Sequence, residues 1–155
     1  MVRTRLAAFF AVAAAVSTLS LAPAGAQITG QNRIFFTVMN GSQETPPNTS
    51  PAIGTAIVFV NPVTNRVCVF YSFSGLVAPA VAAHIHEAPP GVAGPIRIPF
   101  PKPPSATTGA DFFCTIAPAD VVARLVANPS NFYVNVHSTT YPGGEIRGQL
   151  VGVGV

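Results

Sequence analysis

Short runs in which every second residue is apolar recur along most of the chain, and they predict β-strands separated by turns. Successive side chains of a strand point to opposite faces, so each run turns one face toward a core. Clusters of Gly, Pro and Asn separate the runs, and residues 61–65 are typical of a hairpin loop. Short strands at this spacing indicate an all-β fold, an antiparallel Greek-key sandwich or barrel. The predicted strands are residues 32–39, 53–60, 66–73, 81–86, 94–98, 111–116, 132–137 and 145–151.

One short helix is predicted over residues 118–127. Pro118 suits the first turn, Asp120 interacts favourably with the positive end of the helix dipole, and Asn128 followed by Pro129 ends the helix. The apolar residues of this segment form one stripe, Val121, Val122, Leu125 and Val126. We expect the stripe to pack against the sheet, with docking of a partner as the alternative.

The segment 88–110 contains seven prolines. Proline fixes φ and has no N–H to donate, so this segment is expected to form a stiff, partly extended flap. The flap either covers the polar side of the sheet or spans one of its ends.

The first 26 residues resemble a secretory signal peptide. Arg3 and Arg5 precede an apolar run, and residues 23–26 (PAGA) have the small side chains that signal peptidase accepts. An uncleaved anchor is the alternative, although the run is shorter than the ~20 residues of a spanning helix. Cleavage after Ala26 leaves residues 27–155 as a single domain with no further membrane span.

Removal of this segment also takes away Arg3 and Arg5, so six basic residues then face five acidic ones. Recognition of phosphate groups needs clustered Lys and Arg, and a nearly neutral chain therefore has no expected nucleic-acid partner. The expected location is secreted or periplasmic.

The two cysteines, Cys68 and Cys114, are expected to form a disulfide if the protein is exported. Their strands give mixed support. Cys114 alternates with Phe112 and Ile116, an apolar set that is expected to face inward, whereas Cys68 lies opposite the apolar set of its own strand. The sequence thus leaves the pairing open.

All three histidines of the chain lie in two of the predicted strands. His84 and His86 share one face of their strand at a spacing of about 6.6 Å, opposite Ala83 and Ile85. His137 likewise lies opposite the apolar set of its strand. If the two strands are neighbours, three imidazoles converge on a polar patch outside the core.

Such a three-histidine site suits Cu(II) or Zn(II), and copper is preferred because imidazole sites bind it most strongly among the divalent first-row metals. Glu145 is predicted as a further metal ligand, with Asn135 and Arg147 supporting the ligands. The alternative is architectural, with cross-strand hydrogen bonds between the histidines and an ion pair or turn contact made by Glu145 and Arg147. No motif typical of a nucleophilic hydrolase is present, and no catalytic residue is predicted.

Several segments resemble the motifs of the CHRD domain, a family named after chordin that also occurs in secreted bacterial proteins. The matching segments are 41–47 (GSQETPP), 71–76 (YSFSGL), 83–86 (AHIH), 133–137 (YVNVH) and 142–150 (PGGEIRGQL). Glu87 and a Pro-Pro insertion depart from the glycine that usually follows the second histidine. Within the first segment, Glu44 is expected to cap the turn at Pro46 and Pro47.

The resemblance implies an extracellular or periplasmic β domain. We expect an immunoglobulin-like or superoxide-dismutase-like architecture and the role of a binding module, with enzymatic activity left open as an alternative. The order of the His-x-His pair, His137 and Arg147 is also similar to the copper site of copper/zinc superoxide dismutases, although the histidine that bridges copper and zinc there has no counterpart. Three functions stay open: a binding module with a copper or zinc site, a copper-dependent redox enzyme, and a purely structural or protein-interaction domain. The implied partners are a metal ion and an extracellular protein.

Overall fold

The computed structural model describes residues 31–153, and the predicted signal peptide at residues 1–26 lies outside this part of the chain. The strands are β1 (Arg33–Asn40), β2 (Ile53–Asn61), β3 (Arg66–Ser74), β4 (Ala80–Glu87), β5 (Ile96–Pro99), β6 (Gly109–Ile116), β7 (Phe132–Ser138), β8 (Ile146–Gln149) and β9 (Val151–Gly152). The helical elements are α1 (Ala119–Ala127) and two 3-10 turns, η1 (Gly41–Gln43) and η2 (Pro129–Asn131). Across residues 31–153, no helix is long and apolar enough to cross a membrane.

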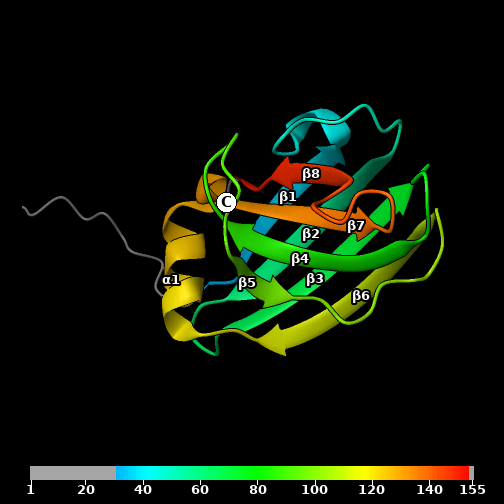
Figure 1. Ribbon diagram of the computed structural model, residues 1–155. Helices are drawn as coiled ribbons and strands as arrows, with labels where there is room; N and C mark the ends of the chain where they lie inside the picture. Colours follow the sequence, from blue (N-terminus) through cyan, green and yellow to red (C-terminus); the bar gives the residue numbers. More distant parts are fainter. Residues whose placement is uncertain (1–30, 154–155) are drawn as a thin grey trace, which may run out of the picture.

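The strands form one antiparallel sheet in the order β5-β4-β7-β8-β1-β2-β3-β6, with β9 paired to β1. The sheet curls into a half-barrel, so that β4 and β7 lie across the core from β2 and β3 (Figure 1). The predicted all-β antiparallel fold with one short helix is confirmed, as is a sandwich-like or barrel-like arrangement. The predicted strand at residues 145–151 is divided into β8 and β9.

Alternation within the strands places the core on the inner face of the curl. In β3 every second residue from Val67 to Phe73 is at most 2 % exposed, and the branched and aromatic side chains of this set suit a strand. The loop at residues 61–65 is the expected hairpin. There the Asn61 side chain accepts hydrogen bonds from the N–H groups of Val63 and Thr64, and Asn65 has the positive φ that asparagine tolerates.

Helix α1 lies at one end of the curled sheet (Figure 1). Val121, Val122 and Leu125 are buried in the core, which confirms that the apolar stripe packs against the sheet. Arg124 bonds Asp120 one turn earlier and also reaches Glu87 at the end of β4. These contacts fix the helix against the strand that carries two of the histidines.

The cysteines form a disulfide between neighbouring strands, Cys68 on β3 and Cys114 on β6, which are directly opposite each other in the sheet register. The expectation that Cys114 faces inward with Phe112 and Ile116 is wrong. Phe112 is 57 % exposed and Ile116 is 66 % exposed, so this set lies on the outer face, the same face as Cys68. The apolar set misled the assignment because the outer face of these strands is itself apolar.

We predict that replacing both cysteines by serine lowers the free energy of unfolding by about 2–4 kcal/mol. The disulfide closes a loop with a sequence separation of 46, which restricts the unfolded chain, and the outer-face position lets serine fit without a cavity. Urea unfolding followed by circular dichroism measures the change. Wild-type protein kept under reducing conditions is the control and should match the variant; an unchanged urea midpoint in both would contradict the prediction.

Candidate metal centre

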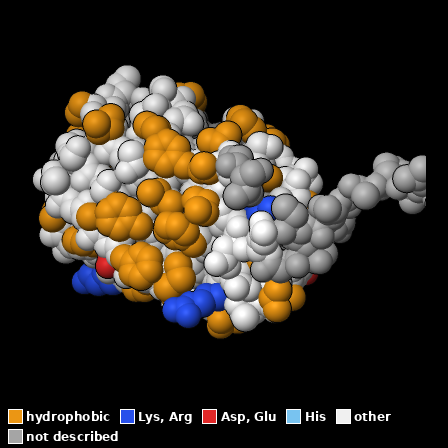
Figure 2. Space-filling view, turned by 180° about the vertical axis from the view of Figure 1, so that it is seen from behind, with side chains coloured by type: hydrophobic (Ala, Val, Ile, Leu, Met, Phe, Trp, Pro, Cys, Tyr) orange, Lys and Arg blue, Asp and Glu red, His pale blue; other side chains and the backbone are white. Residues whose placement is uncertain are grey.

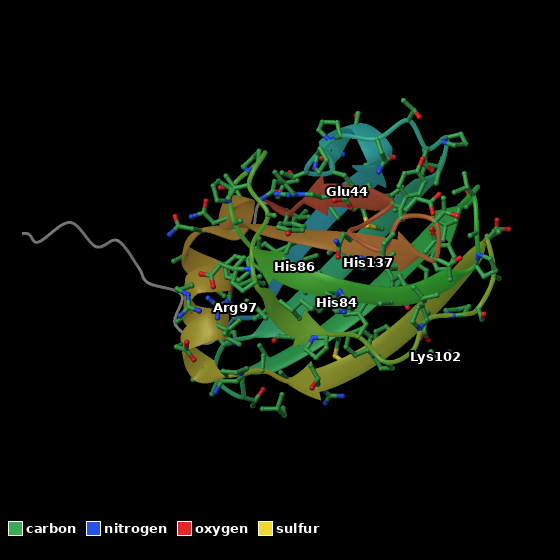
Figure 3. The ribbon with its side chains drawn as sticks, viewed as in Figure 1. Glu44, His84, His86, Arg97, Lys102 and His137 are labelled. Atoms are coloured by element: carbon green, nitrogen blue, oxygen red, sulfur yellow. A yellow bond between two sulfur atoms is a disulfide. The ribbon has the colours of Figure 1, made fainter. Side chains whose placement is uncertain are left out.

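The three histidines meet on the outer face of β4 and β7. The two strands pair so that His84 is opposite Asn135 and Ala82 is opposite His137. One ring nitrogen of each histidine lies within 4.8 Å of the other two. Figure 3 shows the three side chains gathered in this place, with Arg97 and Lys102 lying apart. The predicted convergence of three imidazoles is confirmed.

Hydrogen bonds to backbone carbonyls fix the tautomers of two of the rings. Nδ1 of His86 lies 2.8 Å from the Gly94 carbonyl oxygen, and Nδ1 of His137 lies 3.0 Å from that of Pro142. A carbonyl oxygen only accepts, so each Nδ1 carries the proton and, in the neutral ring, each Nε2 has a free lone pair. The Nε2 atom of His86 is buried without a hydrogen-bond partner among the described residues. This is the arrangement in which a second shell of carbonyls orients metal-binding imidazoles.

The surroundings keep the rings neutral. Burial, followed by the charges that His137 and His86 would carry, lowers the pKa of His84 to about 4. Burial is also the main cause that lowers the pKa of His86 and of His137. At neutral pH the site therefore offers unprotonated imidazoles, the form that binds metal ions.

Asn135 contributes an oxygen to the same place. Its Oδ1 lies 3.1 Å from Nε2 of His137, and Nδ1 of His84 lies 3.1 Å from that same Nε2. Because Nδ1 of His137 already carries the proton, the Nε2 lone pair and the amide oxygen are two acceptors facing each other. Either an N–H donated by Nδ1 of His84 or a bound cation would satisfy the Nε2 lone pair, and only a cation would also satisfy the amide oxygen.

Arg147 was predicted to support the ligands, and the structure places it under the loops that cover the cluster. Its side chain is 1 % exposed and its Cζ lies 3.4 Å from the centre of the Tyr133 ring. It donates to Thr45 and to Gln149 as well as to backbone carbonyls of the flap. The carbonyl acceptors are those of Val92 and Pro89, each 3.0 Å away.

The first part of the flap thus covers the histidine side of the sheet, and two further contacts hold it there. Gly94 donates its N–H to the Tyr133 hydroxyl, and its carbonyl oxygen is the acceptor for His86. The remainder continues as β5 at the sheet edge. The first part of the flap thus takes the expected covering position, whereas β5 extends the sheet at its edge and does not span one of its ends.

Glu145 is not brought to the histidines. Its carboxylate accepts hydrogen bonds from the Ser50 hydroxyl and the Val77 N–H, both at 2.7 Å, and from the Ser138 hydroxyl. The alternation expected through residues 145–151 begins only at Ile146, the first residue of β8. The ion pair between Glu145 and Arg147 is not formed among the described residues either. Glu145 instead ties the loops that contain Ser50 and Val77 to the end of β7.

Glu44 also lies in this polar region. The expectation that it caps the turn at Pro46 and Pro47 did not predict this position. Glu44 is 6 % exposed, and burial raises its pKa to about 7 although Arg147, the Thr45 N–H and Asn135 favour the charged form. Its Oε1 has no hydrogen-bond partner among the described residues. Gly144 lies against this carboxyl group and leaves no room for a side chain. An acidic residue inside a segment that resembles a family motif was the one signal that could have identified Glu44.

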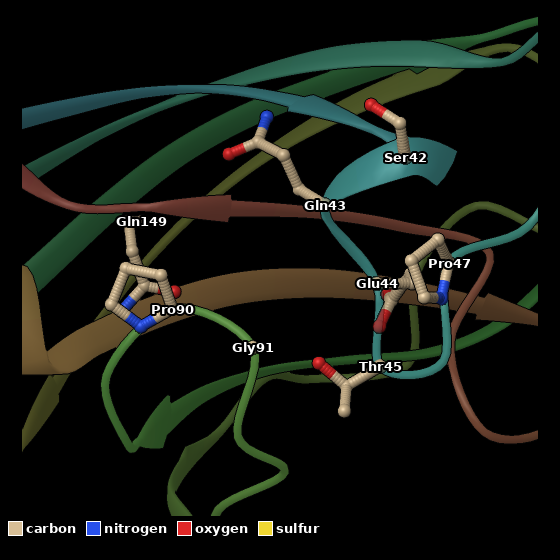
Figure 4. Close-up of a pocket in the computed structure, with 8 residues that line it drawn as sticks. All are labelled: Ser42, Gln43, Glu44, Thr45, Pro47, Pro90, Gly91 and Gln149. Atoms are coloured by element: carbon tan, nitrogen blue, oxygen red, sulfur yellow. The ribbon is translucent and has the colours of Figure 1, made fainter.

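A cavity of about 330 Å³ opens beside Glu44, between the η1 loop and the flap (Figure 4). Its lining includes Gln43, Thr45, Pro90 and Gln149. No histidine lines this cavity, so the histidine cluster and the cavity are separate features.

A model of the CHRD domain family matches residues 35–150 of the chain. No curated protein and no solved structure gives a significant match. The matched span includes the three histidines, Glu44, Asn135 and Arg147.

We predict that the stability difference between wild type and Glu44→Gln changes with pH. The carboxyl pKa is about 7 in the folded protein against 4.5 in the unfolded chain. Its contribution to stability is fully present below pH 4.5 and is lost as the pH rises through about 7. Between pH 5 and pH 8 the wild type should therefore lose up to about 3 kcal/mol relative to the variant, since one pKa unit corresponds to about 1.4 kcal/mol.

Urea unfolding at a series of pH values, with a chelator present, measures this difference, and the histidines cancel because both proteins contain them. Glu87→Gln is the control, since bonds from Arg124 and Arg97 lower the pKa of Glu87 and it should show no such loss. A difference between wild type and Glu44→Gln that does not change with pH would show that the carboxyl titrates normally.

Proposed function

The chain belongs to the CHRD domain family, and on this premise we propose that it is a secreted, non-enzymatic binding module that holds one copper or zinc ion on His84, His86 and His137. CHRD domains are extracellular protein-interaction modules, and the disulfide fits an oxidising compartment. The observation that carries the metal proposal is the cluster of three neutral imidazoles whose nitrogens lie within 4.8 Å of one another.

The donor set favours these metals on chemical grounds. Imidazole nitrogen is a ligand of intermediate softness that suits copper and zinc, and copper binds most strongly in the divalent series. Calcium and magnesium prefer sets of oxygen ligands, which the histidine cluster does not provide. The carbonyls of Gly94 and Pro142 orient the rings of His86 and His137 before any ion binds, which lowers the entropic cost of binding.

A copper-dependent redox enzyme receives less support from the site. In that alternative Arg147 attracts an anionic substrate. This role requires a guanidinium group that is accessible from solvent. Arg147 is 1 % exposed, and it donates hydrogen bonds to Thr45, Gln149 and the flap carbonyls. A protein-interaction domain without metal is the remaining alternative, in which the histidines are sheet architecture.

The expected result of a metal titration is one tight site for Cu(II) or Zn(II) per chain, absent from the His84→Ala/His86→Ala/His137→Ala variant. The protein would be produced by export, stripped with a chelator, and titrated in a calorimeter, with the Cu(II) spectrum reporting nitrogen ligands. Metal binds the unprotonated ring, and the pKa values are lowered. Affinity should therefore hold to a pH well below the ordinary histidine pKa of 6.5.

Glu145→Gln is the matched control, because it removes the one further ligand that the sequence indicated while leaving the histidines in place. We expect it to bind metal with unchanged affinity, since the carboxylate is held by Ser50, Val77 and Ser138. Equal binding by the wild type and the triple histidine variant, or no tight site in the wild type, would remove the metal proposal. The binding function of the module would then rest on protein contacts alone.

A further inference from the structure

The outward face of five neighbouring strands, β9, β1, β2, β3 and β6, is apolar. Nine large apolar side chains of these strands, or of the residue that follows β9, are between 36 % and 59 % exposed: Ile34, Phe36, Val38, Ile53, Phe59, Phe70, Phe112, Val151 and Val153. The view from behind in Figure 2 shows hydrophobic side chains gathered over the middle of the molecule. We call this surface the apolar face.

The sheet register arranges the apolar face in rows that cross the strands. One row consists of side chains that are direct neighbours from strand to strand, Val151, Phe36, Ile57, Phe70 and Phe112. The next row is formed in the same way by Val153, Ile34, Phe59, Cys68 and Cys114. Residues aligned in this manner form a continuous apolar surface, unlike the single exposed apolar residues that are common on proteins.

Charge is nearly absent from the face. On the strands β1, β2, β3, β6 and β9, alternation turns one charged residue outward, Arg66 at the end of β3. An outward face of an antiparallel sheet that meets water normally alternates polar residues with the core set. This face instead has the composition of a surface that packs against another protein layer.

We propose that the apolar face binds the apolar face of a second copy of the chain, with the two sheets packed face to face in a symmetric dimer. A copy of the same face turns one charged residue outward, Arg66 at the end of β3, so the two apolar surfaces can meet without like charges at their centre. Stacked sheets pack at about 10 Å with interdigitating side chains, as in a sandwich core.

The size of the face is close to what a dimer needs. Five strands at about 4.8 Å and about seven residues at about 3.3 Å cover roughly 500 Å² in projection, and protruding aromatic rings raise the accessible area. Two such faces bury more than about 1,000 Å² in total, the lower bound of a specific interface. A lipid surface is a poorer occupant, because peripheral binding to anionic lipids needs several basic residues beside the apolar ones and this face offers Arg66 alone.

The test is sedimentation velocity of the exported, disulfide-bonded protein over a wide range of concentrations. We expect the wild type to sediment with twice the mass of one chain and to dissociate on dilution. Phe70→Glu should be a monomer at concentrations where the wild type is dimeric, and Phe70→Thr, which keeps strand propensity, should be weakened in the same direction. Circular dichroism and thermal unfolding of each variant establish that it is folded.

Val38→Glu and Val81→Glu form a matched pair, because Val38 on the apolar face is 50 % exposed and Val81 on β4 is 45 % exposed. The proposal expects loss of the dimer in Val38→Glu and an unchanged dimer in Val81→Glu. Mixing Phe70→Glu with Phe70→Lys chains should restore association, since only a dimer that uses the same face twice brings the opposite charges together.

Three outcomes would overturn the proposal. One is a wild type that stays monomeric at every concentration, including the case in which it binds neutral phospholipid vesicles. Another is a dimer that Phe70→Glu and Val38→Glu leave intact. The third is a dimer lost equally in Val81→Glu, because the interface would then lie elsewhere.

Discussion

The burial of the Arg147 guanidinium is the constraint on which the outer side of β4, β7 and β8 depends. A cation removed from water is very costly unless its donors are hydrogen bonded. Thr45 and Gln149 accept from it, as do the carbonyls of Pro89 and Val92, so one side chain joins β8 to the η1 loop and to the flap. Two segments distant in sequence are thereby held against the outer side of the sheet.

Burial also determines the protonation state of the histidines. Desolvation is the largest cause that lowers the pKa of all three rings, and His86 and His137 are themselves buried. The flap also supplies the Gly94 carbonyl to His86, while the turn before β8 supplies the Pro142 carbonyl to His137. The flap and this turn therefore fix the tautomers of two rings, while burial keeps the imidazoles neutral. The conformation of these loops is thus coupled to the chemistry of the cluster.

Much of the fold could be predicted from the sequence, because alternation and turn residues are local signals, and the convergence of the histidines followed from strand parity. Assigning the buried side from alternation failed in strands that do not have one buried face and one face exposed to water. All seven residues of β7 are buried, and the outer face at Phe112 is apolar, so neither pattern identified the covered side. The positions of Glu44 and Glu145 depend on loop conformation, which periodicity does not encode.

The polar face that carries the histidines and the apolar face also differ in whether their residues lie in the segments that resemble CHRD motifs. The segments that resemble the CHRD motifs contribute Glu44, His84 and Arg147 to the covered polar face, whereas the central residues of the apolar face, such as Phe36 and Phe70, lie outside all of them. The hydrophobic core separates the faces, since the inner side chains of β2 and β3 stand between them. The chemistry of the polar face thus lies on the segments that resemble the family motifs, while the central contacts of the apolar face lie on strand residues outside those segments.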